Sequence, residues 1–320
     1  MADFALTKNN KQAMLLSVES VRAALEQRGY IASTAIATAV YVAHHLQKPI
    51  LIEGPAGVGK TELAKAMSAC LQQELVRLQC YEGLDESKAL YEWKYGKQLL
   101  YTQMLKEKLG DELQSAKGMH ESMQRLHNMS DEFYAEEFLQ PRPLLQALTH
   151  EDGAVLLIDE IDKADYEFES LLLEVLSDYQ VTVPELGTVF AKSIPLVFLT
   201  SNNTRELSDA LKRRCLHLYI DFPGADLELR IVNSRVPDIS ETLSKSLVNF
   251  VQSLRKIDLK KAPSISETID WANALLLLHA DQLDRAMVES TLNVLLKFQD
   301  DIALVSSDLP ALLAKNNTRH

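Results

Sequence analysis

The sequence predicts an α/β protein: a parallel sheet with helices on both faces, followed by a small all-helical domain. A glycine-rich octapeptide at 54–61 lies between a short apolar strand at 49–53 and a helical run that begins at Glu62. Two further apolar runs, at 153–158 and 194–199, end in polar side chains. Strands that are apolar throughout are typical of a parallel sheet covered on both faces.

The octapeptide reads G-P-A-G-V-G-K-T and matches the phosphate-binding pattern G-x-x-x-x-G-K-[ST] at each fixed position. Its glycines let successive N–H groups point at a triphosphate, and the following helix adds its positive N-terminal end. In this pattern Lys60 reaches the β- and γ-phosphates, and the Thr61 hydroxyl is a ligand of Mg²⁺. We therefore predict a site for ATP and Mg²⁺, whose nucleotide-binding residues are Gly54, Pro55, Ala56, Gly57, Val58, Gly59, Lys60, Thr61 and Glu62.

Two acidic residues, Asp159 and Glu160, directly follow the apolar run at 153–158. Ligands of open α/β sheets bind at the carboxyl ends of the strands. Asp159 is therefore expected to hold Mg²⁺ through water, opposite Thr61. Glu160 is expected to orient and polarise the water that attacks the γ-phosphate.

Polar amides end the apolar run at 194–199. An amide at that place can hydrogen-bond both the attacking water and the γ-phosphate. Asn202 is the predicted residue and Asn203 the alternative. A third interpretation, in which the asparagine only helps the chain to turn, stays open.

Arg213 and Arg214 follow a short predicted helix at 207–211. Cations are favourable at a helix C-terminus whatever their function. The functional alternative is a catalytic arginine that one subunit donates to the nucleotide of its neighbour. We expect one of the two to have that role.

Three aromatic residues, Tyr91, Trp93 and Tyr95, alternate with charged residues inside the segment 82–100. A period of two suits a strand or an extended loop. Either these rings pack on the domain surface, or they form a client-contact loop, because exposed aromatic residues make good anchors.

A charged and mostly helical stretch at 104–138 comes next, and then a more apolar helix at 138–148. A metal site built on His120 and His127 is conceivable, but a solvated helix accounts better for this composition.

Composition narrows the classes of partner and compartment. The net charge of −12 argues only weakly against nucleic acid, for which a basic face is expected, because a hexamer can still line its pore with Lys and Arg. No apolar run approaches the roughly 20 residues needed to cross a bilayer, and the first ten residues lack a signal-peptide core. The three cysteines share no C-x-x-C spacing, which favours a reducing compartment over a disulfide framework or a zinc site. We expect a cytoplasmic protein without membrane insertion.

The order of these motifs resembles that of the AAA+ ATPases. A hairpin-like segment at 180–190, before the strand that carries Asn202, resembles their helix-2-insert group. Residues 54–63, 81–100, 138–148 and 154–164 together resemble the MoxR branch. The likeness is greatest to CoxD-like members, which work with carbon monoxide dehydrogenase and related molybdenum enzymes.

The resemblance implies a homo-oligomeric ring, expected to be a hexamer, with a von Willebrand factor A domain protein as partner. It implies three parts: an N-terminal helical extension at 1–29, an AAA+ domain at 30–222 and a helical lid at 223–320. The segment 82–100 becomes the helix-2 insert, which faces the ring pore. Arg213 aligns best with the arginine finger of the family.

The lid departs from the MoxR pattern at one position. MoxR proteins usually carry a Ser-Pro-Arg whose arginine senses nucleotide, whereas this chain has Ser264, Ile265 and Ser266. Ser264 and Glu267 are spaced as a helix capping box. Closure of the lid on ATP is therefore expected to be weak, or to use another cation.

The leading prediction is an ATP-hydrolysing, ring-forming chaperone that matures a metal- or cofactor-containing enzyme, such as a molybdenum enzyme. One alternative is a nucleic-acid motor of related fold, whose basic residues in the insert are offset by acidic ones. The other is a nucleotide-gated scaffold that hydrolyses poorly, against which the intact Lys60, Asp159 and Glu160 count.

Overall fold

The computed structural model describes residues 15–101, 103, 138–184 and 186–317. The charged stretch predicted at 104–138 therefore lies almost wholly outside the described residues, together with His120 and His127. The same holds for the first half of the predicted N-terminal extension. The described residues include most of the predicted AAA+ domain and nearly all of the predicted helical domain.

Five parallel strands form the central sheet, in the order β2-β5-β8-β1-β9. They are β1 (Ile50–Glu53), β2 (Glu74–Gln79), β5 (Ala154–Asp159), β8 (Leu196–Ser201) and β9 (Leu216–Tyr219). Every residue of β5 and β8 is buried, as their uninterrupted apolar runs predict. Because β8 lies between β1 and β5, the segments that come after these three strands emerge side by side at one edge.

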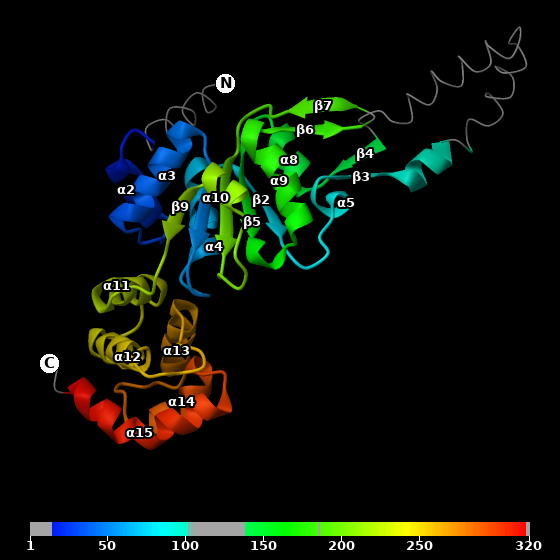
Figure 1. Cartoon of the computed structure of the whole chain (residues 1–320). Helices are drawn as coiled ribbons and strands as arrows, with labels where there is room; N and C mark the ends of the chain where they lie inside the picture. Colours follow the sequence, from blue (N-terminus) through cyan, green and yellow to red (C-terminus); the bar gives the residue numbers. More distant parts are fainter. Residues whose placement is uncertain (1–14, 102, 104–137, 185, 318–320) are drawn as a thin grey trace, which may run out of the picture.

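Helices cover both faces of the sheet, so the predicted fold class is confirmed (Figure 1). On one face lie α2 (Val18–Gln27), α3 (Thr34–Leu46) and α4 (Lys60–Leu71), which share a core with alternate strand residues such as Ile50 and Ile52. On the other lie α8 (Pro143–Thr149), α9 (Tyr166–Asp178) and α10 (Asp209–Arg214), which pack with Leu51 and its equivalents. This division follows from the alternation of side chains along a strand.

The aromatic insert forms a small sheet of its own. After α5 (Glu86–Ala89), β3 (Tyr91–Trp93) pairs antiparallel with β4 (Leu139–Pro141). The predicted helix at 138–148 is therefore wrong in its first part, and α8 begins only at Pro143. A proline at the first helical position has a preset φ and needs no N–H partner, so it starts a helix well.

Trp93 is not the exposed anchor that a client-contact loop requires. Its side chain is only 7% exposed and lies in the same core cluster as Phe138 and Leu139. The period of two is correct, but it places Trp93 on the inner side of β3. Tyr91 is half-buried, and Tyr95, at the start of a helical stretch, is 65% exposed.

The predicted hairpin at 180–190 is present as β6 (Gln180–Val183) and β7 (Gly187–Phe190), which pair antiparallel. A short 3₁₀ helix, η2 (Ile161–Lys163), connects the acidic end of β5 to α9. These two features flank α9, which packs against α10 and therefore supports the arginine-bearing helix.

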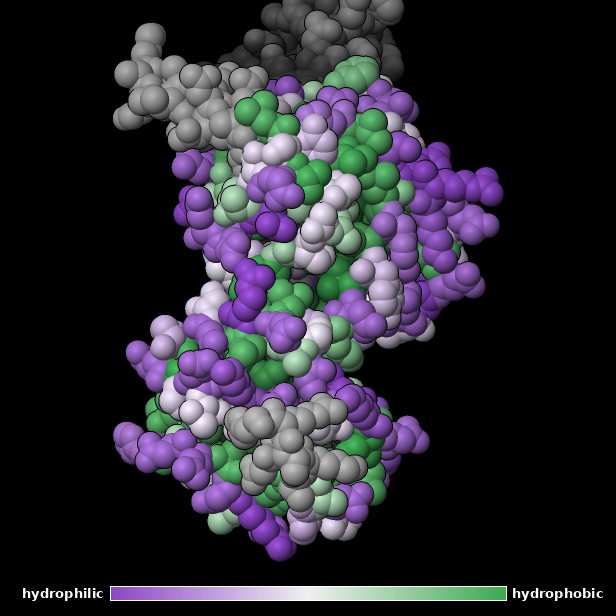
Figure 2. Space-filling model, turned by 90° about the vertical axis from the view of Figure 1, so that its left-hand side faces the viewer, coloured by the Kyte–Doolittle hydropathy of each residue, from purple (hydrophilic) through white to green (hydrophobic). Residues whose placement is uncertain are grey.

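The chain after Gly224 forms helices with a separate core. They are α11 (Ala225–Arg235), α12 (Glu241–Leu254), α13 (Ile265–Leu277), α14 (Arg285–Leu295) and α15 (Gln299–Asn317). Phe250 and Trp271 are buried at the centre of this helical domain. The molecule is narrower where the two domains meet (Figure 2). None of the described helices combines the length and the apolar character needed to cross a membrane.

Candidate active site

Two glycines of the phosphate loop, Gly54 and Gly57, lie where a side chain would clash with neighbouring atoms. Gly54 has a φ of 147°, and a Cβ there would lie 2.0 Å from the carbonyl oxygen of Ile220. Gly57 has a φ of 73°, and its Cβ would lie 2.4 Å from Cβ of Ser264 in the helical domain. The loop therefore passes between β9 and α13 with no room for side chains at these points.

Helix α4 begins directly at Lys60, and its N-cap residue Gly59 offers no side chain to cap it. The first N–H groups of a helix have no partner inside the helix. With the positive end of the helix dipole they form a binding position for an anion. This arrangement fits the phosphates of a nucleotide.

A polar cavity of about 310 Å³ adjoins the loop. Residues from five segments line it: Ala56, Gly57, Gly59, Lys60, Thr61, Glu62, Arg77, Gln79, Asp159, Glu160, Thr200, Asn202 and Ser266. It thus brings together most of the predicted site residues. The topology is the reason, because β1, β8 and β5 end beside one another.

Lys60 is 7% exposed, and its Nζ donates three hydrogen bonds to neutral oxygens. The acceptors are the carbonyl oxygens of Gly54 (2.7 Å) and Pro55 (2.8 Å) and Oδ1 of Asn202 (2.7 Å). Burial lowers the pKa of Lys60, and the nearby carboxylates of Asp162, Asp159 and Glu160 oppose that shift. Because no direct acceptor carries a charge, the ammonium remains able to bind a phosphate.

Thr61 and Asp159 form an oxygen pair suited to Mg²⁺. The Thr61 hydroxyl donates to Oδ1 of Asp159 at 3.1 Å, and the carboxylate is almost completely buried. Arg77 Nη2 also donates to this carboxylate, at 2.5 Å, and so does the Thr200 hydroxyl, at 2.5 Å. Mg²⁺ prefers one or two carboxylate or hydroxyl ligands, with phosphate and water completing its octahedron. The two side chains fit that requirement.

Glu160 lies at the rim of the cavity with a left-handed backbone, at a φ of 57°. A non-glycine residue in that region is strained by about 1–3 kcal/mol, and such residues cluster at functional sites. Its N–H donates to Oγ1 of Thr200 at 2.9 Å. Its carboxylate accepts from Gln79 Nε2 at 2.9 Å and pairs with Lys163 Nζ at 2.6 Å. The strained turn therefore points a held, partly exposed carboxylate at the cavity.

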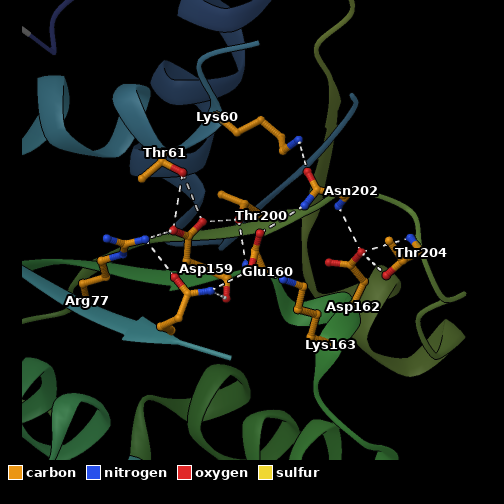
Figure 3. A network of polar contacts seen from close by, with 11 residues as sticks. Lys60, Thr61, Arg77, Asp159, Glu160, Asp162, Lys163, Thr200, Asn202 and Thr204 are labelled. Carbon is orange, nitrogen blue, oxygen red and sulfur yellow. Dashed lines mark hydrogen bonds and ion pairs between the residues drawn. The ribbon is translucent and has the colours of Figure 1, made fainter. Parts of the chain in front are cut away.

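Asn202 joins the loop lysine to this acid (Figure 3). Its Oδ1 accepts from Lys60, and its Nδ2 donates to Oε1 of Glu160 at 3.4 Å. Of the two asparagines, Asn202 is the one that lines the cavity. Asn203 has a φ of 58° and occupies the turn after the strand.

Sequence reasoning missed three residues that line the cavity: Arg77, Gln79 and Thr200. Arg77 and Gln79 lie two apart at the end of β2, on one side of a strand that pairs with β5. Two polar residues at that spacing are a weak signal in themselves. They gain meaning only once β2 is known to neighbour the strand that ends in Asp159.

A second, mainly apolar cavity of about 280 Å³ adjoins the first at Gly57, Gly59, Glu62 and Ser266. Its lining includes Tyr30, Ile36, Val58, Ile220, Phe222, Ile265 and Ile269, from both domains. An apolar cleft with a few polar groups suits a small planar ligand. Because it lies next to the polar cavity, it is suited to the base of a nucleotide whose phosphates bind at the loop.

Neither Arg213 nor Arg214 belongs to these cavities. Both lie in the last turn of α10. Arg214 Nε donates to Oγ of Ser177 at 2.6 Å within its own chain. Arg213 is exposed, and among the described residues it forms no hydrogen bond or ion pair. Of the two, Arg213 is the one free to reach another molecule.

The helical domain lines both cavities without the arginine of the MoxR pattern. The capping box of Ser264 and Glu267 is present at the start of α13. Ser266, one residue into the helix, lines both cavities. Arg235 of α11 lines the apolar cavity, with Nη2 3.5 Å from Oε2 of Glu62. It is the cation that this domain brings to the cavity walls in the described structure.

Comparison with known proteins identifies the family. Residues 49–215 match the family described as AAA domain (dynein-related subfamily). The chain belongs to this AAA family. The matched range contains the phosphate loop, Asp159, Glu160, Asn202 and Arg213. The narrower resemblance to the MoxR branch stays a prediction.

Individual relatives and solved structures are similar to this AAA protein only at low sequence identity. It is 26% identical over 238 residues to an uncharacterized Staphylococcus epidermidis protein, covering 72% of this chain and 76% of that one. It is 27% identical over 239 residues to an uncharacterized Staphylococcus aureus protein, with the same coverage of 72% and 76%. The Thermotoga maritima RuvB Holliday junction branch migration motor is 20% identical, with a TM-score of 0.42. That alignment covers 81% of this chain and 66% of RuvB.

Proposed function

We propose that this AAA protein hydrolyses ATP to ADP and phosphate. The observation that carries the proposal is the polar cavity in which Lys60, Thr61, Asp159, Glu160 and Asn202 meet. These five residues come from distant parts of the chain and supply a cation, a pair of metal-ligand oxygens, a base and an amide. A cavity that only bound a nucleotide would need neither the strained, rim-placed Glu160 nor its link to Asn202.

The binding step uses the loop and the start of α4. The uncapped N–H groups of the helix and the Lys60 ammonium bind the phosphates, and Lys60 exchanges neutral acceptors for charged ones. Thr61 and Asp159 would hold Mg²⁺, which when bound neutralises charge on the phosphates and polarises their oxygens. The apolar cavity between the domains receives the purine base of the nucleotide.

In the chemical step, Glu160 orients water on the γ-phosphate side of the cavity and accepts its proton. Asn202 contacts both the Glu160 carboxylate and Lys60, so its position registers whether a phosphate has drawn Lys60 away. Thr200 fixes the relation between the two acids. It accepts from the N–H of Glu160 and donates to Asp159.

Glu160→Gln is the experiment that tests the proposal. It keeps the size of the side chain and removes the base, so turnover should fall at least about 100-fold, as for loss of a general base. ATP affinity should stay within about threefold of the original, because the loop is untouched. Glu151→Gln, which alters another exposed glutamate paired with a lysine, is the matched control and should keep full turnover. Half of the original turnover in Glu160→Gln contradicts the assignment of the base.

We further propose that the protein works as a ring, expected to be hexameric, in which Arg213 reaches the γ-phosphate of the neighbouring subunit. The exposed position of Arg213, outside the cavity of its own chain, supports this proposal. An arginine donated in this way contributes about 10³–10⁵ to the rate. Turnover per subunit should therefore rise with protein concentration.

Mixing Arg213→Ala subunits with Glu160→Gln subunits should restore part of the activity, because each supplies what the other lacks. A mixture that stays inactive, although mass spectrometry detects mixed rings, contradicts the assignment. Restoration with Arg214→Ala but not with Arg213→Ala moves the role to Arg214.

The client class is also a proposal: a metal- or cofactor-containing enzyme matured together with a von Willebrand factor A domain protein. Tyr95, Leu99 and Leu100, on the helical stretch after β3, are 65%, 60% and 53% exposed and offer apolar anchors. A purified von Willebrand factor A domain partner should bind the ATP-loaded Glu160→Gln protein. Stimulation of turnover by double- or single-stranded DNA, without binding of that partner, favours the nucleic-acid motor instead.

A further inference from the structure

The loop at 202–208 joins two functional positions. It begins at Asn202 in the polar cavity and ends at Ser208, the N-cap of α10, whose last turn carries Arg213. Its residues have no helical or strand assignment, so ladder hydrogen bonds do not hold it. Two buried carboxylates do, one at each end.

Asp162 holds the first end (Figure 3). Its side chain is 3% exposed, and its Oδ2 accepts from the N–H of Asn202 at 3.2 Å. The same oxygen accepts from Thr204, through the N–H at 3.0 Å and the hydroxyl at 2.6 Å. Burial alone would raise the pKa of Asp162, but these hydrogen bonds hold it below its usual value. The charged form is therefore the one that binds the loop.

Glu169 of α9 holds the second end. Its side chain is 1% exposed, and Oε2 accepts from the N–H of Ser208 at 2.9 Å. Its other oxygen pairs with Arg205 Nη2 at 2.6 Å, and the same guanidinium stacks over the ring of Tyr166. Ser208 in turn accepts from the N–H of Leu211 and caps α10. The start of the arginine helix is thereby tied to α9.

Both carboxylates belong to one short segment, 161–169, that directly follows Asp159 and Glu160. Neither Asp162 nor Glu169 lines the cavity. Each therefore acts through other residues. Hydrogen bonds to a charged acceptor are the stronger kind, and a catalytic group displaced by about 1 Å can lose about 100-fold in rate.

We propose that Asp162 and Glu169 are positioning residues with separable effects. Asp162 positions Asn202 in its own active site, and Glu169 positions the arginine helix that is offered to the neighbouring subunit. The inference rests on the proposed ATP hydrolysis and on the trans action of Arg213. Asp162→Asn should therefore impair the active site of the subunit that carries it. Glu169→Gln should instead impair the active site of the neighbouring subunit, which receives Arg213 from the variant.

Mixing experiments test this separation. Each variant alone should lose about tenfold in turnover, as expected when a charge-assisted hydrogen bond is weakened, with ATP affinity within about threefold. A mixture of Asp162→Asn with Glu169→Gln should exceed the mean of the two separate activities. So should Asp162→Asn with Arg213→Ala. Two other mixtures, Asp162→Asn with Glu160→Gln and Glu169→Gln with Arg213→Ala, should not exceed their mean, because both members of each pair have the same defect.

Asp301→Asn is the matched control. This carboxylate is 3% exposed and accepts from the N–H groups of Lys260 and Lys261 in a loop of the helical domain. Its replacement should lower the melting temperature without lowering turnover of the folded protein. Should Asp162→Asn or Glu169→Gln fail to fold, Thr204→Val and Arg205→Met weaken the same two contacts and are scored identically.

The outcomes distinguish the inference from the proposed function. If Glu160→Gln and Arg213→Ala complement each other but the Asp162 and Glu169 variants do not, the positioning roles are overturned. Equal losses of turnover in the Asp301→Asn control overturn them as well. If Glu160→Gln and Arg213→Ala themselves fail to complement each other, Arg213 does not act on the neighbouring subunit. The positioning role of Glu169 is then overturned too. Asp162 is then judged by turnover and ATP affinity: loss of both, with a lower melting temperature, overturns its role.

Discussion

In the helical domain, Arg255 and Glu228 form a two-point ion pair at 2.6 and 2.7 Å, with side chains 8% and 0% exposed. Thr268 and Gln252 donate to the same carboxylate, so its oxygens are well satisfied. At the edge of the sheet, Lys60 instead contacts three neutral oxygens beside an open cavity.

The difference lies in whether the charged partners are replaceable. In the closed cluster of Arg255, Glu228, Thr268 and Gln252, the two opposite charges are buried together, so neither can take a new partner unless the domain unfolds. Lys60 and its three acceptors, by contrast, are held by single contacts to neutral oxygens beside an open cavity. Burial of charge is therefore paired and closed in one region, and in the other it leaves a cation beside a cavity, as the proposed phosphate binding requires.

Arg255→Met should have the largest effect and should fall on stability. It leaves the buried Glu228 without its counter-charge, which lowers the free energy of unfolding by about 3–5 kcal/mol. Denaturant unfolding measures this loss. Arg285→Met, which breaks an exposed ion pair with Glu289, is the control and should change stability by less than about 0.5 kcal/mol. A loss below about 1 kcal/mol in Arg255→Met would show that the closed cluster is not stabilising.

Trp93→Ala and Tyr95→Ala extend the comparison to apolar side chains two residues apart. Trp93 is 7% exposed and Tyr95 65%. Removing the buried indole should cost about 3 kcal/mol, whereas removing the exposed ring should change stability by at most about 0.5 kcal/mol. Thermal melting of both variants, together with basal ATP turnover, measures the contrast. Equal melting temperatures contradict the burial of Trp93.

Lys60→Met should have the smallest effect on stability and act on binding. Burial lowers the pKa of Lys60, so at neutral pH its charged form destabilises the folded state, and this cost fades as pH rises through that pKa. The melting temperature should stay unchanged or rise. ATP affinity should fall at least tenfold, about 1.4 kcal/mol, because the proposed cation on the phosphates is lost. Lys245→Met, which removes an exposed lysine paired with Glu241, is the control for charge and should leave ATP affinity unchanged. A clear drop in the melting temperature would contradict this prediction, because it would show that Lys60 stabilises the fold as the Arg255–Glu228 pair does.

The sequence by itself determined the features whose cause is local. The phosphate loop, the strand ending in Asp159 and the capping box at Ser264 depend on residues within a few positions of one another. Their backbone geometry is set by glycine torsions, strand propensity and side-chain caps. The order of the motifs along the chain was then enough to predict the fold class.

Tertiary structure decided which residues meet across strands and domains. Arg77 beside Asp159, Asn202 rather than Asn203 beside Lys60, and the inward side of Trp93 all depend on which strand neighbours which. The sheet order β2-β5-β8-β1 sets the first two, and the pairing of β3 with β4 sets the third. Such pairings join residues far apart in sequence, which local propensity and motif spacing do not encode.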